Sequence, residues 1–174
     1  MAYFFTADQH FGHAAIIAAC DRPFRDADDQ TRQLIDRWNK VVGKSDHVFV
    51  VGDFAIKASP ESLTEIFNAM NGTKSLIVGN HDCKQVQALP WRSFDDRKPE
   101  LAVTDQLRFR HEKQTYFMAH YAWRTWPEDH HGSIHLFGHT HGTLPDLARS
   151  TDVGVDCWDY TPVSMDQIKQ RVGV

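Results

Sequence analysis

The sequence has few cysteines, no long apolar run and no block of basic residues, and each absence excludes a class of protein. The three cysteines, Cys20, Cys83 and Cys157, are far apart and form no CxxC pair, so we expect neither a disulfide framework nor a thiolate zinc site. No apolar stretch approaches the ~20 residues that cross a membrane, so no membrane partner is expected. The formal net charge of −4 argues against a domain that binds long nucleic acid through its backbone.

The sequence also shows no segment typical of a linker or a targeting signal. The 174 residues contain no low-complexity or Pro/Gly/Ser-rich stretch, so the sequence predicts one domain over residues 1–174. A strand-like pattern begins at Tyr3 without a charged and then apolar leader, which predicts a cytoplasmic location.

Histidine, by contrast, is abundant, and eleven of them in a chain of this length indicate metal binding. Five apolar, strand-like segments each run into an Asp, Asn or His, at the strand ends where chemistry tends to lie in α/β proteins. These junctions are Tyr3–Ala7 before Asp8-Gln9-His10, His47–Val51 before Gly52-Asp53, Ser75–Val78 before Gly79-Asn80-His81-Asp82, Thr115–Ala119 before His120, and Ile134–Phe137 before Gly138-His139-Thr140-His141.

Helices are predicted between the first three strands. One helix, capped by Asp28 or Asp29, presents an apolar stripe until Gly43 stops it. Another begins at Ser59-Pro60-Glu61, which supplies a capping hydroxyl and a proline at the first helical position, and ends at Asn71-Gly72. This alternation of strands and helices favours parallel strand pairing with crossover helices.

The second half of the chain has a different pattern. Leu101–Arg110 and Thr115–Ala119 are separated by four polar residues and predict a hairpin. Further short strands are expected near Ile134 and Thr151, and Ser164–Arg171 is expected to form a short helix. The best estimate is a set of mixed sheets with helices outside.

The five junctions supply oxygen and imidazole ligands but no thiolate: Asp8, His10, Asp53, Asn80, His120, His139 and His141. Asp8 and His10 are two residues apart, a spacing that points both side chains to one side of an extended segment. Such a set suits Mn²⁺ first, and also Fe, Zn²⁺, Ni²⁺ or Mg²⁺. Seven ligands are too many for one ion but suit two divalent ions that share a bridging carboxylate, a design used for phosphoryl transfer.

In this order, the motifs Asp-x-His, Gly-Asp, Gly-Asn-His-Asp, a lone His after a strand and Gly-His-x-His resemble the calcineurin-like metallophosphoesterase superfamily. The resemblance spans residues 8–141. A compact group of bacterial and phage predicted phosphoesterases is similar in four further segments: His10-Phe11-Gly12-His13, Arg22-Pro23-Phe24, His131-Gly132-Ser133 and Gly154-Val155-Asp156-Cys157-Trp158. The second motif lacks the longer Gly-Asp-x-x-Asp-Arg-Gly of protein phosphatases, which disfavours a phosphoprotein substrate.

The resemblance implies an α/β sandwich of two mixed β-sheets flanked by helices, and it implies a role for each motif residue. Asp8, His10 and His141 would hold one metal, Asn80, His120 and His139 would hold the other, and Asp53 would bridge them. A hydroxide shared by the two metals would attack the phosphorus. His81 would donate a proton to the leaving oxygen. Asp82 would orient the His81 ring.

Substrate contacts are expected from residues near the motifs. Arg22 and Arg124 carry guanidinium groups that match phosphate geometry, with plain surface charge as the alternative, and His13 follows the first motif by one turn. The predicted reaction is hydrolysis of a small phosphomonoester or phosphodiester, such as a nucleotide. One alternative is a Mn²⁺-dependent nuclease on single-stranded nucleic acid, and another is a non-catalytic scaffold of the same fold.

Overall fold

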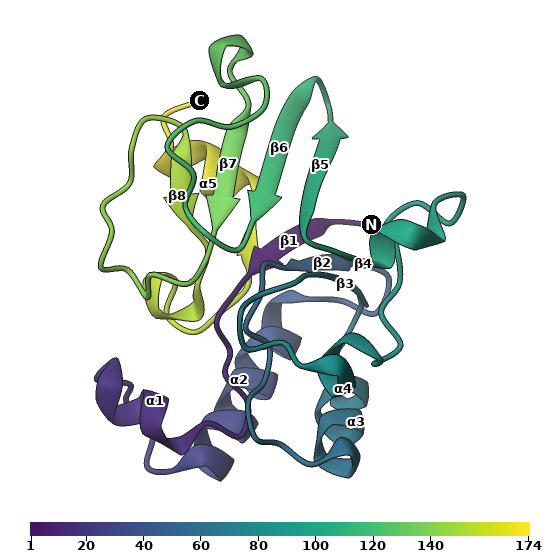
Figure 1. Ribbon diagram of the computed structural model, residues 1–174, viewed down its shortest axis with the longest axis vertical. Coiled ribbons are helices and arrows are strands. Elements are labelled where there is room, and N and C mark those ends of the chain that lie inside the picture. The colour runs from purple at the N-terminus through teal and green to yellow at the C-terminus, as the bar shows by residue number, and fades with distance from the viewer.

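Two β-sheets form the centre of the molecule, and the computed structural model describes all residues 1–174 (Figure 1). The first sheet has the order β4 (Val103–Thr104), β3 (Thr73–Ile77), β2 (His47–Val50), β1 (Tyr3–Thr6), β9 (Val163–Ser164). The second has the order β5 (Gln106–His111), β6 (Gln114–Ala119), β7 (Ile134–Phe137), β8 (Ser150–Asp152). Only β1–β9 and β5–β6 pair antiparallel, so both sheets are mixed and the predicted fold class is confirmed.

The two sheets pack face to face through aromatic and aliphatic side chains. Phe5 of β1 is in register with Phe49 of β2, and its ring lies 5.4 Å from the ring of Phe49 and 5.4 Å from that of Tyr116 in β6. All three side chains are fully buried or nearly so. Such burial contributes about 1.5–3 kcal/mol per large side chain, so this layer fixes the two sheets relative to each other.

Helices cover the opposite face of the first sheet, below it in Figure 1. The two longest are α2 (Ala27–Val41) and α3 (Pro60–Ala69), and Trp38 and Phe67 pack in one core cluster with Val48 of β2. The shorter helices α1 (Ala14–Ala19) and α4 (Lys84–Gln87) also lie below the first sheet in Figure 1. Helix α5 (Met165–Arg171) lies beside the second sheet instead, with Ile168 in the core between the sheets. The 3₁₀ turns are η1 (Pro99–Ala102), η2 (Asp129–His131) and η3 (Val155–Cys157). None of these helices combines the length and apolar character needed to cross a membrane.

Of the two predicted helix starts, that of α3 is confirmed and the predicted capping residue of α2 is wrong. Ser59 caps α3 as predicted, because its hydroxyl accepts a hydrogen bond from the amide of Ser62. The cap of α2 is Asp26, which accepts from the amide of Asp29 at 2.8 Å, and not Asp28 or Asp29. The helix begins at Ala27, before the first residue of the apolar stripe, so Asp28 and Asp29 lie in its first turn.

The predicted hairpin exists but is tighter and shorter than expected. His111 pairs with Gln114, and the intervening Glu112 and Lys113 both have left-handed φ values of 47° and 72°, as a two-residue hairpin turn requires. The start of the predicted strand at 101–105 instead contains the end of η1 and the two-residue strand β4. Strands this short leave no periodic signal, and the same applies to β9.

Two histidines lie within strands, rather than in the loops that follow them, and are buried in the sheets. The His47 ring lies within hydrogen-bond distance of the Thr73 and Ser75 hydroxyls, and the His135 ring lies between the carbonyl of Phe117 and the amide of Trp123. Burial lowers the pKa of each ring from 6.5 to about 4, so both are neutral at pH 7.

These buried rings predict a loss of stability in mild acid. Since the folded-state pKa lies below the unfolded value, the unfolded chain binds more protons, and the free energy of unfolding falls as the pH drops from 6.5 towards 4. Each ring is expected to lower it by about 2 kcal/mol by pH 5. Urea unfolding of the metal-free protein at pH 7 and pH 5 measures the loss. His47→Gln should reduce this pH dependence, whereas His130→Gln, at an exposed ring, should leave it unchanged.

Candidate metal centre

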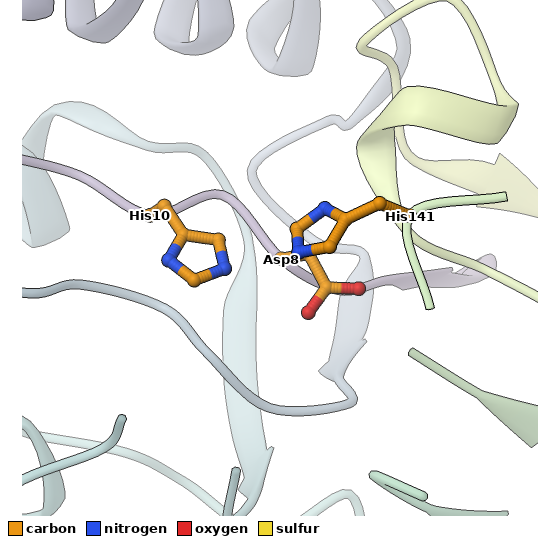
Figure 2. Close-up of side chains that lie close together, drawn as sticks. All are labelled: Asp8, His10 and His141. Carbon is orange, nitrogen blue, oxygen red and sulfur yellow. The ribbon is translucent and has the colours of Figure 1, made fainter. Parts of the chain in front are cut away.

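The loops that follow β1, β2, β3, β6 and β7 meet at one edge of the sandwich, because the parallel strands of each sheet end there. Two groups of potential metal-ligand atoms lie at this edge. Asp8, His10 and His141 offer atoms that all lie within 4.8 Å of one another, and Figure 2 shows the three side chains converging. Asp53, His120 and His139 form the second group by the same measure.

Asp53 lies between the two groups. Its Oδ2 is 3.6 Å from Nε2 of His10 on one side and 3.4 Å from Nε2 of His120 on the other. The second group also contains the Asn80 amide oxygen, which is 3.0 Å from both His120 Nε2 and His139 Nδ1. The structure thus brings all seven predicted ligands together, in two candidate sites that share one carboxylate oxygen.

The polar atoms of this pocket fit a cation. Asp8 Oδ1 and His10 Nε2 are buried and have no hydrogen-bond partner in the protein, although buried polar atoms are rarely left unpaired. The other Asp8 oxygen accepts from the amide of His139 at 2.9 Å, which leaves Oδ1 free on the pocket side. Burial raises the pKa of Asp8 to about 8, against the opposing charges of His141 and His120. A bound divalent ion would satisfy both unpaired atoms and the buried carboxylate.

The backbone at the ligands is unusual. Five of the seven candidate ligands have left-handed φ values between 48° and 68°: Asp8, His10, Asp53, His139 and His141. The two side chains of the first motif therefore converge through this local geometry and not through the extended segment that the sequence predicts. A left-handed conformation costs a non-glycine residue about 1–3 kcal/mol, although Asp and His adopt it more readily than most residues, so the surrounding structure must hold these loops in place.

Glycine is needed beside the ligands for space as well as for conformation. Gly52 has a φ of +91°, and a Cβ at this position would lie 2.2 Å from Nδ1 of His120. A Cβ on Gly79 would lie 2.3 Å from Oδ1 of Asp53. The Gly-Asp and Gly-Asn-His-Asp motifs thus contain glycine because two ligand loops touch there.

Hydrogen bonds at the far side of the rings orient the histidines. Nδ1 of His120 donates to the carbonyl of Val51 at 2.9 Å, and Nδ1 of His141 lies 2.8 Å from Oδ2 of Asp156. Each ring therefore turns its Nε2 towards the pocket. Burial lowers the pKa of His120, but the hydrogen bond and charge of Asp53 outweigh it and raise the pKa to about 9. A metal entering the second site must displace this proton.

His81 lies at the rim of the pocket. Its side chain is 40% exposed, its Nε2 is 4.0 Å from Asp53 Oδ2, and its ring centre is 5.4 Å from that of His10. The backbone amide of His81 donates to Asp53 Oδ1 at 2.9 Å, which holds the residue beside the shared carboxylate.

Asp82 differs from its predicted role. Its carboxylate accepts hydrogen bonds from the backbone amides of Asp53, Phe54 and Gly79 at 2.8–2.9 Å and has no bond to the His81 ring. Asp82 is buried, so its oxygens satisfy amides of two adjacent loops. The expectation that it orients His81 is corrected: it joins the loops after β2 and β3, and so positions Asp53.

The three predicted substrate-binding residues lie in three different settings. His13 is at the centre, with its Nδ1 3.3 Å from Nδ1 of His10. Arg22 is buried, and its guanidinium bonds to protein acceptors, so the prediction that it contacts substrate is corrected. Arg124 is exposed and lines a groove of about 480 Å³ with Trp126 and Leu147, and none of the seven ligands lines that groove.

The sequence alone assigned no role to two acidic residues that lie at the centre. Asp156 bonds to His141, and Asp152 accepts from the Thr140 hydroxyl and the Gly142 amide, which fixes the loop that carries the last two ligands. The Tyr121 ring lies 4.5 Å from the ring of His139 and is half exposed. The available signal for Asp156 was the segment Gly154-Val155-Asp156-Cys157-Trp158, which is similar to the compact phosphoesterase group.

Comparisons with known proteins agree with this architecture. The uncharacterized protein MJ1445 of Methanocaldococcus jannaschii is 27% identical over 95% of this chain and 88% of its own length. The Gene 66 protein of Mycobacterium phage D29 is also 27% identical, over 97% of this chain and 94% of its own. The crystal structure of AQ665 from Aquifex aeolicus, a protein of unknown function, has a similar fold, with a TM-score of 0.72, 21% identity and 98% of both chains covered.

A second structural neighbour, a novel archaeal phosphodiesterase, has a TM-score of 0.50 and 16% identity, with 88% of this chain and 82% of that chain covered. These structures establish the fold alone. The sequence model of one family, described as Calcineurin-like phosphoesterase, matches residues 1–143. This match includes all seven candidate ligands and most of the chain, and the protein therefore belongs to the calcineurin-like phosphoesterase family.

Proposed function

We propose that this protein is a dimetal phosphoesterase that hydrolyses a small, nucleotide-like phosphate ester. The observation that supports it most is the position of Asp53 Oδ2, within 3.6 Å of a nitrogen from each ligand group. A carboxylate in that position can bridge two cations, and paired cations are a recurrent device for in-line attack on phosphorus.

The two sites would hold divalent ions with oxygen and imidazole ligands, with Mn²⁺ the first choice. When bound, the ions supply Lewis-acid activation of a water molecule and of the phosphate oxygens. The chain contributes the ligand geometry through Asp8, His10 and His141 in one site and Asn80, His120 and His139 in the other, with Asp53 shared.

His81 is the proposed proton donor to the leaving oxygen. It is the histidine at the rim that the seven-ligand set leaves unused, and its partial exposure allows contact with a substrate. His13 is the proposed second donor to the substrate phosphate. Because His10 would bind metal through Nε2, its Nδ1–H donates to His13 Nδ1, and the His13 proton then lies on Nε2.

A panel of substrates tests the proposal. Protein purified without chelator should contain two divalent ions per chain and hydrolyse 4-nitrophenyl phosphate, bis(4-nitrophenyl) phosphate or free nucleotides. EDTA should abolish the activity and Mn²⁺ should restore it. Cleavage of single-stranded oligonucleotides alone would favour the nuclease, and metal-free protein without any hydrolysis under Mn²⁺ would favour the scaffold.

Tyr121 is the proposed contact for an aromatic group of the substrate. Its half-exposed ring lies beside His139 at the open side of the second site, where a base or aryl group could stack on it. Tyr121→Ala should raise KM for aryl and nucleotide esters about 2- to 10-fold, since an aromatic pair contributes about 0.5–1.5 kcal/mol. Tyr121→Phe, which keeps the ring, should retain the original KM. Equal KM values for all three proteins would remove Tyr121 from the substrate site.

A further inference from the structure

The Arg22 guanidinium is the most completely bonded buried charge in the molecule's centre. Its side chain is 0% exposed, and its three nitrogens make five hydrogen bonds, which uses every N–H that a guanidinium has. Two of these bonds form a fork onto the Asp156 carboxylate, from Nε at 2.8 Å and from Nη2 at 2.7 Å. A group so fully occupied cannot bind a substrate phosphate.

The other bonds of Arg22 lead to the first metal motif. Nη2 donates to the backbone carbonyl of Asp8 at 2.7 Å, and Nη1 donates to that of Gln9 at 3.1 Å. Nη1 also donates to the Gln30 side chain, whose amide donates in turn to the carbonyl of His10 at 3.3 Å. Arg22 and Gln30 therefore bond to three consecutive carbonyls, and the first and third of these residues, Asp8 and His10, have left-handed φ values.

The Asp156 side of the network reaches the third ligand. Oδ2 of Asp156 receives Arg22 Nη2 and also lies 2.8 Å from Nδ1 of His141. Because this oxygen can only accept, the His141 proton must lie on Nδ1, and Nε2 carries the lone pair that faces the pocket. Asp156 is also tied to Arg22 as an ion pair, so the carboxylate cannot rotate away from the imidazole.

We propose that Arg22, with Asp156 and Gln30, is the positioning element of the site formed by Asp8, His10 and His141. The inference rests on the proposed dimetal function. One guanidinium fixes the backbone of the first two ligands and, through Asp156, the tautomer and direction of the third. Asp82 bonds instead to the loops of the shared ligand Asp53 and of Gly79, and Arg22 bonds to neither loop. Loss of the Arg22 network should therefore weaken the site of Asp8, His10 and His141 and leave the ligands of the second site in place.

Asp156→Asn is the sharpest test, because it replaces an acceptor by an amide of the same shape. Whichever way the new amide turns, its N–H₂ group faces a donor: Arg22 Nε in the Oδ1 position, or Arg22 Nη2 and His141 Nδ1 in the Oδ2 position. The fork between Arg22 and residue 156 is therefore broken, and the negative charge beside His141 is lost. Titration with Mn²⁺ followed by electron paramagnetic resonance should show an exchange-coupled pair in the wild type. Asp156→Asn should bind one uncoupled Mn²⁺ tightly, with the other at least about 10-fold weaker.

Further variants separate positioning from charge and from folding. Arg22→Lys keeps the charge but loses the fork, and it should also lose the coupled signal. The double variant Arg22→Met/Asp156→Asn removes both buried charges, which proteins often tolerate, and it should fold with one site intact. The matched control is Arg108→Lys in β5, where Arg108 forms an exposed ion pair with Glu128. This variant should keep two coupled ions.

Each outcome has one meaning. A wild type without a coupled pair contradicts the proposed dimetal function itself. A wild type with a coupled pair and variants that keep it contradicts the positioning role. Equal weakening of both sites, together with a lower unfolding temperature of the metal-free protein, would show that Arg22 supports only the general fold.

Discussion

Replacing His81 by alanine should lower kcat by about 10²–10⁴-fold while two metal ions stay bound. The ring is half exposed at the rim and belongs to neither ligand group, so its removal leaves the seven ligands in place. The amide of His81 that bonds to Asp53 belongs to the backbone and survives the substitution. Proton donation to the leaving oxygen is then the function that is lost.

The choice of substrate makes this prediction specific. A leaving group such as 4-nitrophenolate departs without protonation, so His81→Ala should slow 4-nitrophenyl esters far less than alkyl or nucleoside esters. His13→Ala is the comparison. Because it removes a proposed donor to the substrate phosphate, it should raise KM by a similar factor for both kinds of ester. If His81→Ala slowed all esters equally, or released a metal ion, the role of proton donor would have to be abandoned.

The sequence predicts the fold well wherever a segment carries its own pattern. Ser59 before Pro60 predicts the start of α3, and five apolar runs predict the strands that lead to the centre. Strands β4 and β9 have two residues each, and their pairing depends on neighbours that are remote in sequence. The cap at Asp26 was missed because two other acids follow it closely.

The sequence could predict which residues belong to the candidate centre but not where each side chain points or which groups it contacts. The residue types in the motifs and their order predict seven candidate ligands, and the structure brings these seven side chains together at one edge of the sandwich. Whether an arginine faces outwards or inwards depends on burial, and Arg22 is turned inwards by Asp156, which lies 134 residues away. The sequence likewise predicted that Asp82 orients the His81 ring, whereas its carboxylate accepts from backbone amides of a neighbouring loop.

The two buried charges solve the same problem in opposite ways. Ligand loops with left-handed residues are strained, so hydrogen bonds from a buried side chain must hold their backbone. Carbonyls point inwards behind the first motif, and a cation, Arg22, bonds to them. Amides point inwards between the second and third motifs, and an anion, Asp82, bonds to those. The polarity of each buried side chain thus follows from which backbone groups the loop leaves unpaired.

Asp53→Asn should have the second large effect, because it changes the one atom that both sites share. Asn keeps the shape of the side chain, and its oxygen can still accept from the His81 amide, so the loop should remain folded. Whichever atom occupies the Oδ2 position, the negative charge between His10 and His120 is gone. We expect kcat to fall by about 10³-fold or more, as the loss of several kcal/mol of charge stabilisation requires.

Metal content and exchange coupling give the independent measurement for Asp53→Asn. Protein saturated with Mn²⁺ should retain at most one tightly bound ion and no coupled signal, because a neutral amide bridges cations poorly. Asp46→Asn is the matched control, since the Asp46 carboxylate accepts from the amides of Ala2 and Gly43 and from no atom of the centre. Two coupled ions and an unchanged kcat in Asp53→Asn would mean that the ions, and the attack on phosphorus, depend on some other bridge.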